Sequence, residues 1–152
     1  MACVDHLLCP SAQPDNEGAV VFGVVSHQDG RPSVGWLETA MPVTPDLLAL
    51  SGDTPPTQVL RIAAKCPESR CVHFDGEDCQ LARRIVAALE PVSVECSPCA
   101  IRGDCRWFYQ ESLHVCTRCP QIVTYDANPD PALREVARPR AVAREAWFGT
   151  LL

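Results

Sequence analysis

Cysteine is the residue type whose number and spacing point most directly to chemistry in this chain, which has 10 cysteines among 152 residues. Two lie upstream, at Cys3 and Cys9, and the other eight form two groups. The first group reads C-x4-C-x7-C and consists of Cys66, Cys71 and Cys79. The second reads C-x2-C-x5-C-x10-C-x2-C and consists of Cys96, Cys99, Cys105, Cys116 and Cys119. This crowding indicates metal or cluster binding rather than thiols that pack as small hydrophobic side chains.

The expected location of the protein bears on the state of these thiols. The first residues contain no basic start, no apolar stretch and no small-residue cleavage site, which predicts a cytoplasmic protein. Cytoplasmic thiols are kept reduced, so we expect metal ligands rather than disulfides.

Zinc is one candidate for the second group. Its two C-x2-C pairs have the spacing of a zinc ribbon, in which two turns supply four thiolates to a tetrahedral ion. That assignment leaves Cys105 without a role and makes the first group, with His73, a separate site. A zinc-stabilised protein-interaction module is therefore the alternative interpretation.

One or two 4Fe-4S clusters use more of the thiols, because a cubane accepts ligands from irregularly spaced loops. In the favoured assignment one cluster takes Cys99, Cys105, Cys116 and Cys119, and another takes Cys66, Cys71 and Cys79, completed by Cys9 or His73. Cys96 is then a spare or alternative ligand.

Cys105 and Cys116 test this assignment. A single helix would hold them about 16 Å apart, at about 1.5 Å per residue, which is too far for one cluster. Either a helix breaks near Glu111–Leu113, where Ser112 is a modest helix former, or the two cysteines serve different centres.

Several strings taken together resemble a family of small cysteine-rich bacterial proteins that are often labelled "nitrogen fixation protein". The strings are Leu8-Cys9-Pro10, Val21-Phe22-Gly23-Val24-Val25, the segment 66–79 with His73-Phe74-Asp75-Gly76, Cys105-Arg106-Trp107-Phe108 with Gln110-Glu111, and Arg118-Cys119-Pro120-Gln121. The similarity covers residues 8 to about 125. The resemblance implies a link to iron–sulfur metabolism without an established activity, and Ser112 stands where the family pattern has glycine.

Strand and helix signals in the sequence predict an α+β fold, with a β-rich platform over 1–65. Strands at 19–26 and 33–38 flank Asp29-Gly30, a hairpin signal. Thr44-Pro45 begins a short helix, and 57–64 is a third strand.

A cysteine-rich region is predicted over 66–125, and a linker with a helical tail over 126–152. In the first, Asp78 and Asp104 are expected to cap helices, and 92–95 and 122–125 are expected to be strands. The first of these helices carries Arg83 and Arg84 on its polar side, and the apolar end of the tail, 147–152, is expected to dock onto a partner.

The net charge and the motifs of the sequence argue against several classes of function. The net charge is −6 and no basic stripe is present, which argues against nucleic acid as a partner. No apolar run approaches the roughly 20 residues of a membrane span. No catalytic motif is recognised, so an enzyme is the less favoured class. We therefore expect a small iron–sulfur protein that transfers electrons, senses redox state or delivers a cluster, with a redox enzyme or a cluster-assembly component as its protein partner.

Overall fold

One four-stranded antiparallel sheet forms the centre of the fold. The structure, a computed structural model, describes residues 6–125 and 129–139. The strands are β1 (Leu8–Cys9), β2 (Val20–Gln28), β3 (Arg31–Pro42) and β4 (Leu60–Lys65). They lie in the order β1-β4-β2-β3, and every neighbouring pair is antiparallel. With the short helices described next, this sheet confirms the predicted α+β class.

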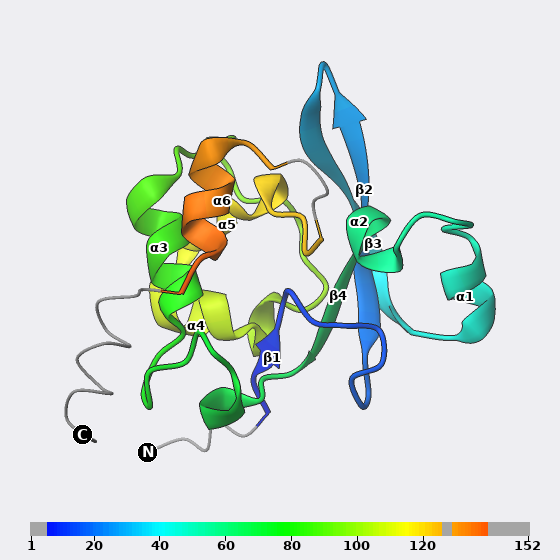
Figure 1. Cartoon of the computed structure of the whole chain (residues 1–152), viewed down its shortest axis with the longest axis horizontal. Helices are drawn as coiled ribbons and strands as arrows, with labels where there is room; N and C mark the ends of the chain where they lie inside the picture. The colour runs from blue at the N-terminus through cyan, green and yellow to red at the C-terminus, as the bar shows by residue number, and fades with distance from the viewer. Residues whose placement is uncertain (1–5, 126–128, 140–152) are drawn as a thin grey trace.

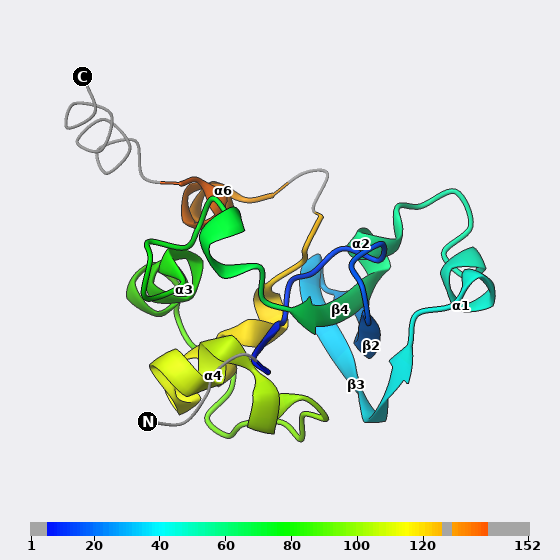
Figure 2. The same cartoon turned by 90° about the horizontal axis from the view of Figure 1, so that it is seen from below.

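Short helices cover the sheet. They are α1 (Pro45–Ala49), α2 (Pro56–Val59), α3 (Gln80–Ala88), α4 (Arg106–Glu111), α5 (Leu113–Cys116) and α6 (Pro131–Ala137), with 3-10 turns η1 (Glu68–Arg70), η2 (Arg102–Asp104) and η3 (Cys119–Gln121). Figures 1 and 2 show α3, α4 and α6 together on one side of the sheet and α1 at the opposite side of the molecule. β1, the edge strand of the sheet, contacts both β4 and α4 (Figure 1).

Two local predictions in the first part of the chain are confirmed. Gln28 pairs with Arg31 across the hairpin, and Asp29 and Gly30 have φ values of 53° and 78°. Positive φ at both central residues is the turn that matches the twist of a two-residue hairpin. At α1, the Thr44 side chain accepts a hydrogen bond from the backbone N–H of Leu47 at 3.1 Å, as expected for an N-cap.

Three predicted strands differ from the structure. The third strand starts at residue 60 rather than 57, because residues 57–59 belong to α2. The segments 92–95 and 122–125 are irregular. In these segments the backbone N–H of Val92 bonds to Thr117 and that of Tyr125 bonds to Thr57, which are single tertiary hydrogen bonds and not a strand ladder.

Two predicted helix caps are wrong. The N-caps of α3 and α4 are Cys79 and Cys105, not the aspartates that precede them. Asp78 instead forms an ion pair with Arg83 of α3. Arg84 was expected on the polar side of α3, but it is buried because α6 covers it: its Nε donates to the carbonyl of Val136 at 2.7 Å.

The predicted helix break is confirmed at Ser112, which separates α4 from α5. Ser112 has φ 59° and ψ −150°, a conformation that glycine adopts far more readily than other residues. The break means that Cys105, at the start of α4, and Cys116, at the end of α5, are not held at the two ends of one straight helix.

The alternation of side chains along β4 divides the core into two parts. Leu60, Ile62 and Ala64 belong to the core on the α1 and α2 side, with Val21 of β2. Ala63 belongs to the core that packs under the helices, with Phe22. Because successive side chains of a strand point to opposite faces, Arg61 lies on the same face as Ala63, and its guanidinium stacks on the Phe22 ring at 5.3 Å.

The predicted tail begins with α6, which packs on α3 and buries Val136. The apolar segment 147–152, expected to dock onto a partner, lies outside the described residues, as does Cys3. No helix in the described part of the chain has the length and apolar character that crossing a bilayer requires.

Candidate metal centres

Eight cysteines from distant parts of the chain line two separate pockets. Pocket A is lined by Cys9, Cys66, Cys71 and Cys79. Pocket B is lined by Cys99, Cys105, Cys116 and Cys119. All eight thiols are free. The thiols divide between the pockets along the same lines as the favoured assignment from sequence; that either group holds a cluster stays a prediction.

The thiols of pocket A are positioned by β1, by turns that follow β4, and by the start of α3. Cys9 pairs with Ala64 of β4, and the N–H of Cys66 donates to the carbonyl of Leu7 at 2.9 Å. The N–H of Cys71 closes η1 by donating to Glu68 at 2.8 Å. Cys9, from the beginning of the chain, therefore lies beside the first cysteine group because β1 and β4 pair.

Burial and the charges of neighbouring thiols oppose ionisation of Cys9 and Cys79 in pocket A. Burial raises the pKa of Cys9 to about 12, and the charges of Cys79, Cys66 and Cys71 contribute further to the rise. Burial also raises the pKa of Cys79, which the backbone amides of Ala82 and Leu81 partly offset. The interactions of Cys9 with the other three show that all four thiols lie close enough to affect one another. An unliganded thiolate is disfavoured here, whereas a bound cation would reverse that preference.

His73 lines pocket A with an imidazole that is already hydrogen-bonded. Its Nδ1 lies 2.7 Å from Nη2 of Arg84. A guanidinium is always a donor, so Nδ1 accepts, and in the neutral imidazole the remaining nitrogen carries the proton. Burial, followed by the charge of Arg84, lowers the pKa of His73 and keeps the ring neutral. This arrangement leaves no free lone pair for a metal, so Cys9 fits the fourth ligand position better than His73.

Two residues from α4 support pocket A. The Gln110 side chain accepts from the N–H of Cys79 at 2.7 Å and donates to the carbonyl of Cys79 at 2.8 Å. Arg106, which is 4% exposed, forms an ion pair with Glu68 at 2.7 Å and stacks on the Phe74 ring at 5.1 Å. Together they tie the loop that carries Cys71 and Cys79 to the helix that follows Cys105.

The thiols of pocket B come from the segment before η2, the two ends of the α4–α5 pair, and η3. Cys99 accepts the backbone N–H of Arg102 through its carbonyl at 3.3 Å, and Cys105 ends η2 by donating to Arg102 at 3.2 Å. Cys116 ends α5, and Cys119 begins η3. The turn at Ser112 brings both ends of this helical pair to one pocket.

Burial also raises the pKa of three pocket B thiols, those of Cys99, Cys105 and Cys116. It raises the pKa of Cys105 to about 12, and the pKa values of Cys99 and Cys116 rise for the same reason. The charge of Cys119 contributes to all three shifts, which shows that the four thiols are near neighbours. As for Cys9 and Cys79 in pocket A, the neutral form of these three thiols is favoured until a cation is bound.

Arg102 provides a positive charge at the edge of pocket B. Burial by itself lowers the pKa of Arg102, but a hydrogen bond with Cys116 and the charges of Cys116, Cys99 and Cys96 raise it above its ordinary value. Cys96 therefore lies near the pocket without lining it, and its thiol donates weakly to the carbonyl of Leu113 at 3.9 Å. This position is consistent with a spare or alternative ligand.

Of the other arginines that adjoin cysteines, Arg106 and Arg118 interact elsewhere. Arg106 pairs with Glu68, and Arg118 donates to the carbonyls of Leu89 and His114.

Arg61 is the residue at pocket B that sequence reasoning missed. It is 0% exposed, and its Nη2 donates to the Cys119 sulfur at 3.2 Å and to the carbonyl of Pro10 at 3.0 Å. Its Nη1 donates to the carbonyl of Cys119 at 2.9 Å. No carboxylate of the described residues forms an ion pair with Arg61, and its Nε has no hydrogen-bond partner among them. A buried cation without a counter-ion is costly, so this guanidinium fits an anionic sulfur.

The signal for Arg61 was a charged residue in the middle of an otherwise apolar strand segment, Leu60-Arg61-Ile62-Ala63-Ala64. Gln110 was also missed as a supporting residue. Its link to Cys79 spans 31 positions, which no local pattern reveals.

The two pockets differ in size. Pocket A encloses about 500 Å³ and pocket B about 30 Å³. A space like that of pocket B holds about one water-sized group. No group of three or more His, Cys, Asp or Glu side chains within residues 6–125 and 129–139 has the arrangement that holds a metal ion.

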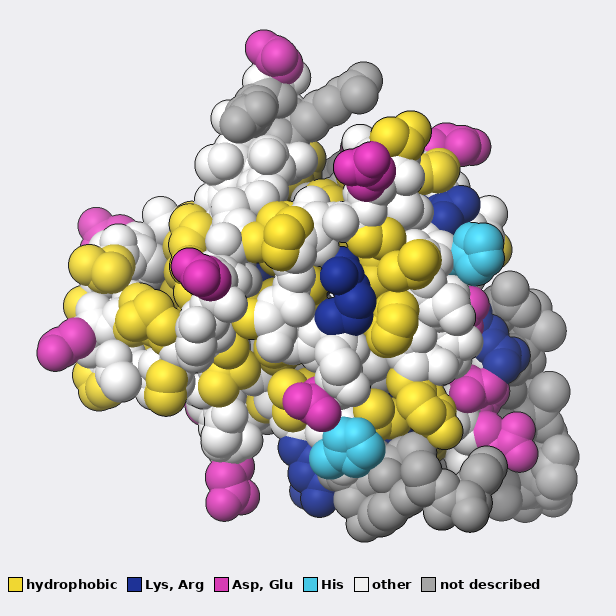
Figure 3. Space-filling view, turned by 180° about the vertical axis from the view of Figure 1, so that it is seen from behind, with side chains coloured by type: hydrophobic (Ala, Val, Ile, Leu, Met, Phe, Trp, Pro, Cys, Tyr) yellow, Lys and Arg dark blue, Asp and Glu magenta, His cyan; other side chains and the backbone are white. Residues whose placement is uncertain are grey.

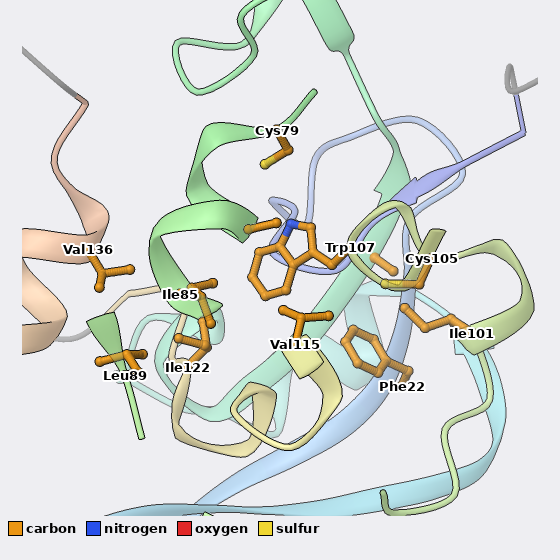
Figure 4. Packing of buried hydrophobic residues seen from close by; sticks show 12 residues of the cluster. Phe22, Cys79, Ile85, Leu89, Ile101, Cys105, Trp107, Val115, Ile122 and Val136 are labelled. Atoms are coloured by element: carbon orange, nitrogen blue, oxygen red, sulfur yellow. The ribbon is translucent and has the colours of Figure 1, made fainter. Parts of the chain in front are cut away.

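Trp107 forms the wall between the pockets. It is 1% exposed, and among the residues that the structure describes it is the only one that lines both pockets. Figure 4 shows its indole between Cys79, a pocket A residue, and Cys105, a pocket B residue. Phe108 lines pocket B alone, and Tyr109 is exposed. A buried ring in this place excludes water from both groups of thiols.

The comparisons with known proteins provide no family assignment. No protein-family model, no curated protein and no solved structure matches this chain. The resemblance to the "nitrogen fixation protein" family therefore stays a prediction from sequence, and the function rests on the residues of the two pockets.

Proposed function

We propose that this protein binds two 4Fe-4S clusters, one in each pocket, and transfers electrons to a partner protein. The observation that carries the proposal is the gathering of four free thiols at each of two pockets from segments far apart in sequence. Four cysteine thiolates are the usual ligand set of a 4Fe-4S cluster. When bound, the cluster would supply one-electron redox chemistry, and the protein would hold it, exclude water and set its charge environment.

The volume of pocket A supports a cluster there. A single zinc ion draws four thiolates to about 2.3 Å from one point, whereas a cubane separates its ligands around a larger core. The space of about 500 Å³ in pocket A suits the larger group.

The small volume of pocket B makes zinc the second candidate for that pocket. A cluster there requires the lining side chains to rotate outward from a space of about 30 Å³. Both a 4Fe-4S centre and a zinc ion with four thiolates carry a net charge of about −2. Either would therefore provide the anion that Arg61 lacks, and the metal content decides between them.

An electron-transfer role fits the rest of the chain better than catalysis. No catalytic motif is recognised, and among the described residues the face drawn in Figure 3 carries separate acidic side chains and only isolated basic ones. With a net charge of −6 before any anionic centre is added, the chain favours a partner with a basic docking surface. Redox sensing and cluster delivery are alternative roles that would use the same two centres. We also propose that the protein acts in the cytoplasm.

The test is anaerobic reconstitution of the full chain with ferrous iron and sulfide, followed by metal analysis and spectroscopy. We expect a brown protein with about eight iron ions per chain, whose visible absorption bleaches with dithionite. About four iron ions with one zinc ion would assign zinc to one pocket. A colourless protein that retains only zinc would overturn the iron–sulfur proposal. The Cys96→Ser variant is the matched control and should load fully.

A further inference from the structure

Pocket A extends beyond its four cysteines. The cavity reaches from β1, which carries Cys9, to α6, and side chains from the segments 122–125 and 129–137 line its α6 side. Neither of these segments contains a cysteine. The volume of about 500 Å³ lies within the range of roughly 300–1,000 Å³ that is usual for pockets that hold small organic molecules. The thiols therefore account for only part of this cavity.

The wall of the cavity contains arginines and no acidic residue. Arg106 of α4 and Arg134 of α6 both line it, and no Asp or Glu is among the described residues that do. Arg106 is 4% exposed and pairs with Glu68 through Nη2, but its Nε has no hydrogen-bond partner within the described part of the chain. Arg134 is exposed, donates to the carbonyl of Pro129 at 3.2 Å, and forms no ion pair with any described carboxylate. Both arginines therefore retain donors or charge for a ligand.

His73 adds a neutral donor to the same wall, and Arg84 adds positive charge next to it. Because Nδ1 of His73 accepts from Arg84 at 2.7 Å, the proton of the neutral ring is on the other nitrogen. Arg84 itself is buried, and its Nε donates to the carbonyl of Val136 in α6. In a chain with a net charge of −6, this cavity is thus a local region of positive charge, which favours an anionic ligand.

Apolar side chains form much of the remaining wall and limit the kind of anion that fits. They include Phe74, Leu81, Trp107, Leu133 and Val136. A phosphate group brings up to two charges and three acceptor oxygens, and an apolar wall would leave some of these oxygens unsatisfied. A carboxylate has one charge and two oxygens, which a guanidinium can bind side by side. The wall therefore suits a carboxylate on an apolar body.

We propose that the α6 side of pocket A binds a small organic carboxylate. Arg134 and Arg106 hold the carboxylate, and the apolar wall holds the body of the molecule. The proposal does not rest on the iron–sulfur assignment, because none of the side chains that it uses is a thiol. Binding forms and breaks no covalent bond.

The first experiment titrates the full chain with benzoate by isothermal titration calorimetry, with benzamide as the neutral probe of the same shape. We expect saturable binding of benzoate at one site and binding of benzamide that is weaker by about tenfold or more, which is the contribution of a charge-assisted hydrogen bond. Equal affinities for the two probes, or no saturable binding of benzoate, would overturn the proposal. Inorganic phosphate that binds as tightly as benzoate would overturn the carboxylate assignment.

The second experiment uses a matched pair of variants, Arg134→Gln and Arg138→Gln. Both arginines are exposed, but only Arg134 lines pocket A, whereas Arg138 pairs with Glu135. Arg134→Gln should weaken benzoate binding by about tenfold, and Arg138→Gln should leave it unchanged. Equal affinities of the two variants would overturn the proposal. Arg106→Gln should weaken binding at least as much as Arg134→Gln, and Arg134→Gln remains informative if the buried substitution prevents folding.

The outcomes separate this inference from the proposed function. The titrations use the chain as purified, without added iron, and their readout is heat rather than colour. A chain that binds benzoate but takes up no iron would overturn the proposed function and leave the carboxylate site standing. A chain that takes up about eight iron ions but does not bind benzoate would do the reverse.

Discussion

The two cysteine pockets use the same number of thiols but surround them differently. Pocket A encloses about 500 Å³. Residues of α6, which packs on α3, line one side of it. Pocket B encloses about 30 Å³ among the sheet, α4 and η3; Arg61 donates to its Cys119 sulfur, and Arg102 lines it. Pocket A thus offers the larger space, and pocket B lies beside two arginines.

This difference shows how one small fold can give two groups of four thiols different surroundings. Burial by apolar residues sets water access, whereas buried arginine donors set the charge at the sulfur atoms. Trp107 separates the two environments at a single side chain. The comparison therefore yields predictions that should affect one pocket, the other, or both.

The largest expected effect is loss of one cluster from one pocket. Cys71→Ser and Cys116→Ser each remove one half-buried thiol, from pocket A and pocket B respectively. Each variant should retain about four iron ions per chain instead of about eight, because three thiolates hold a cluster poorly. Iron analysis and visible absorption check this result, with Cys96→Ser as the full-loading control. Loss of all iron from either single variant would contradict the independence of the pockets.

The next effect concerns the shared wall. Trp107→Ala should lower the free energy of unfolding by about 3–5 kcal/mol, the usual cost of deleting a buried tryptophan side chain. It should also expose both clusters to water and oxygen, whereas Phe108→Ala should affect pocket B alone. Anaerobic urea unfolding and the rate of bleaching in air measure the two effects. Bleaching confined to one cluster in Trp107→Ala would show that the ring does not protect both.

The pH dependence of the metal-free chain should show that both pockets oppose ionisation. The pKa values of Cys9 and Cys105 are raised from 9.0 to about 12 in the folded state. Between these values the folded chain keeps protons that the unfolded chain has lost, so stability is greatest below pH 9 and falls as the pH rises toward 12. The loss should approach about 1.4 kcal/mol per pH unit for each thiol.

Urea unfolding at several pH values measures this loss, and Cys9→Ser and Cys105→Ser should each remove about half of it. A metal-free chain that becomes more stable above pH 9 would contradict the prediction. In the loaded protein the thiols are ligands in their deprotonated form, so the alkaline loss should disappear and acid should instead release the metal.

The smallest expected effect is that of removing α6, which lines pocket A and not pocket B. A chain ending at Asp130 lacks α6, and with it Leu133 and Val136 of the pocket A lining, whereas a chain ending at Pro139 keeps them. The shorter chain should bleach faster in air at the pocket A cluster only. The rate of iron loss measures this effect. Comparison with the spectra of Cys71→Ser and Cys116→Ser, which should each retain one cluster, identifies the affected centre. Equal bleaching of the two truncated chains would show that α6 gives no protection.

Local sequence signals predicted the elements that depend on neighbouring residues. Asp29-Gly30 predicted the hairpin, Thr44-Pro45 predicted α1, and the ligand geometry predicted a break near Ser112. Signals failed where tertiary contacts decide. The segments 92–95 and 122–125 have β-forming side chains but no neighbouring strand, and a cysteine, rather than the preceding aspartate, caps α3 and α4.

The sequence by itself determined the α+β class and the two groups, with eight of the ten cysteines, whose spacing points to metal binding. Only the tertiary structure decided which thiols share a pocket, because the antiparallel pairing of β1 with β4 brings Cys9 to the first group across more than fifty positions. It also decided that Arg61 bonds to a pocket B cysteine. Strand alternation points its buried side chain toward the helices, where it donates to the sulfur and the carbonyl of Cys119.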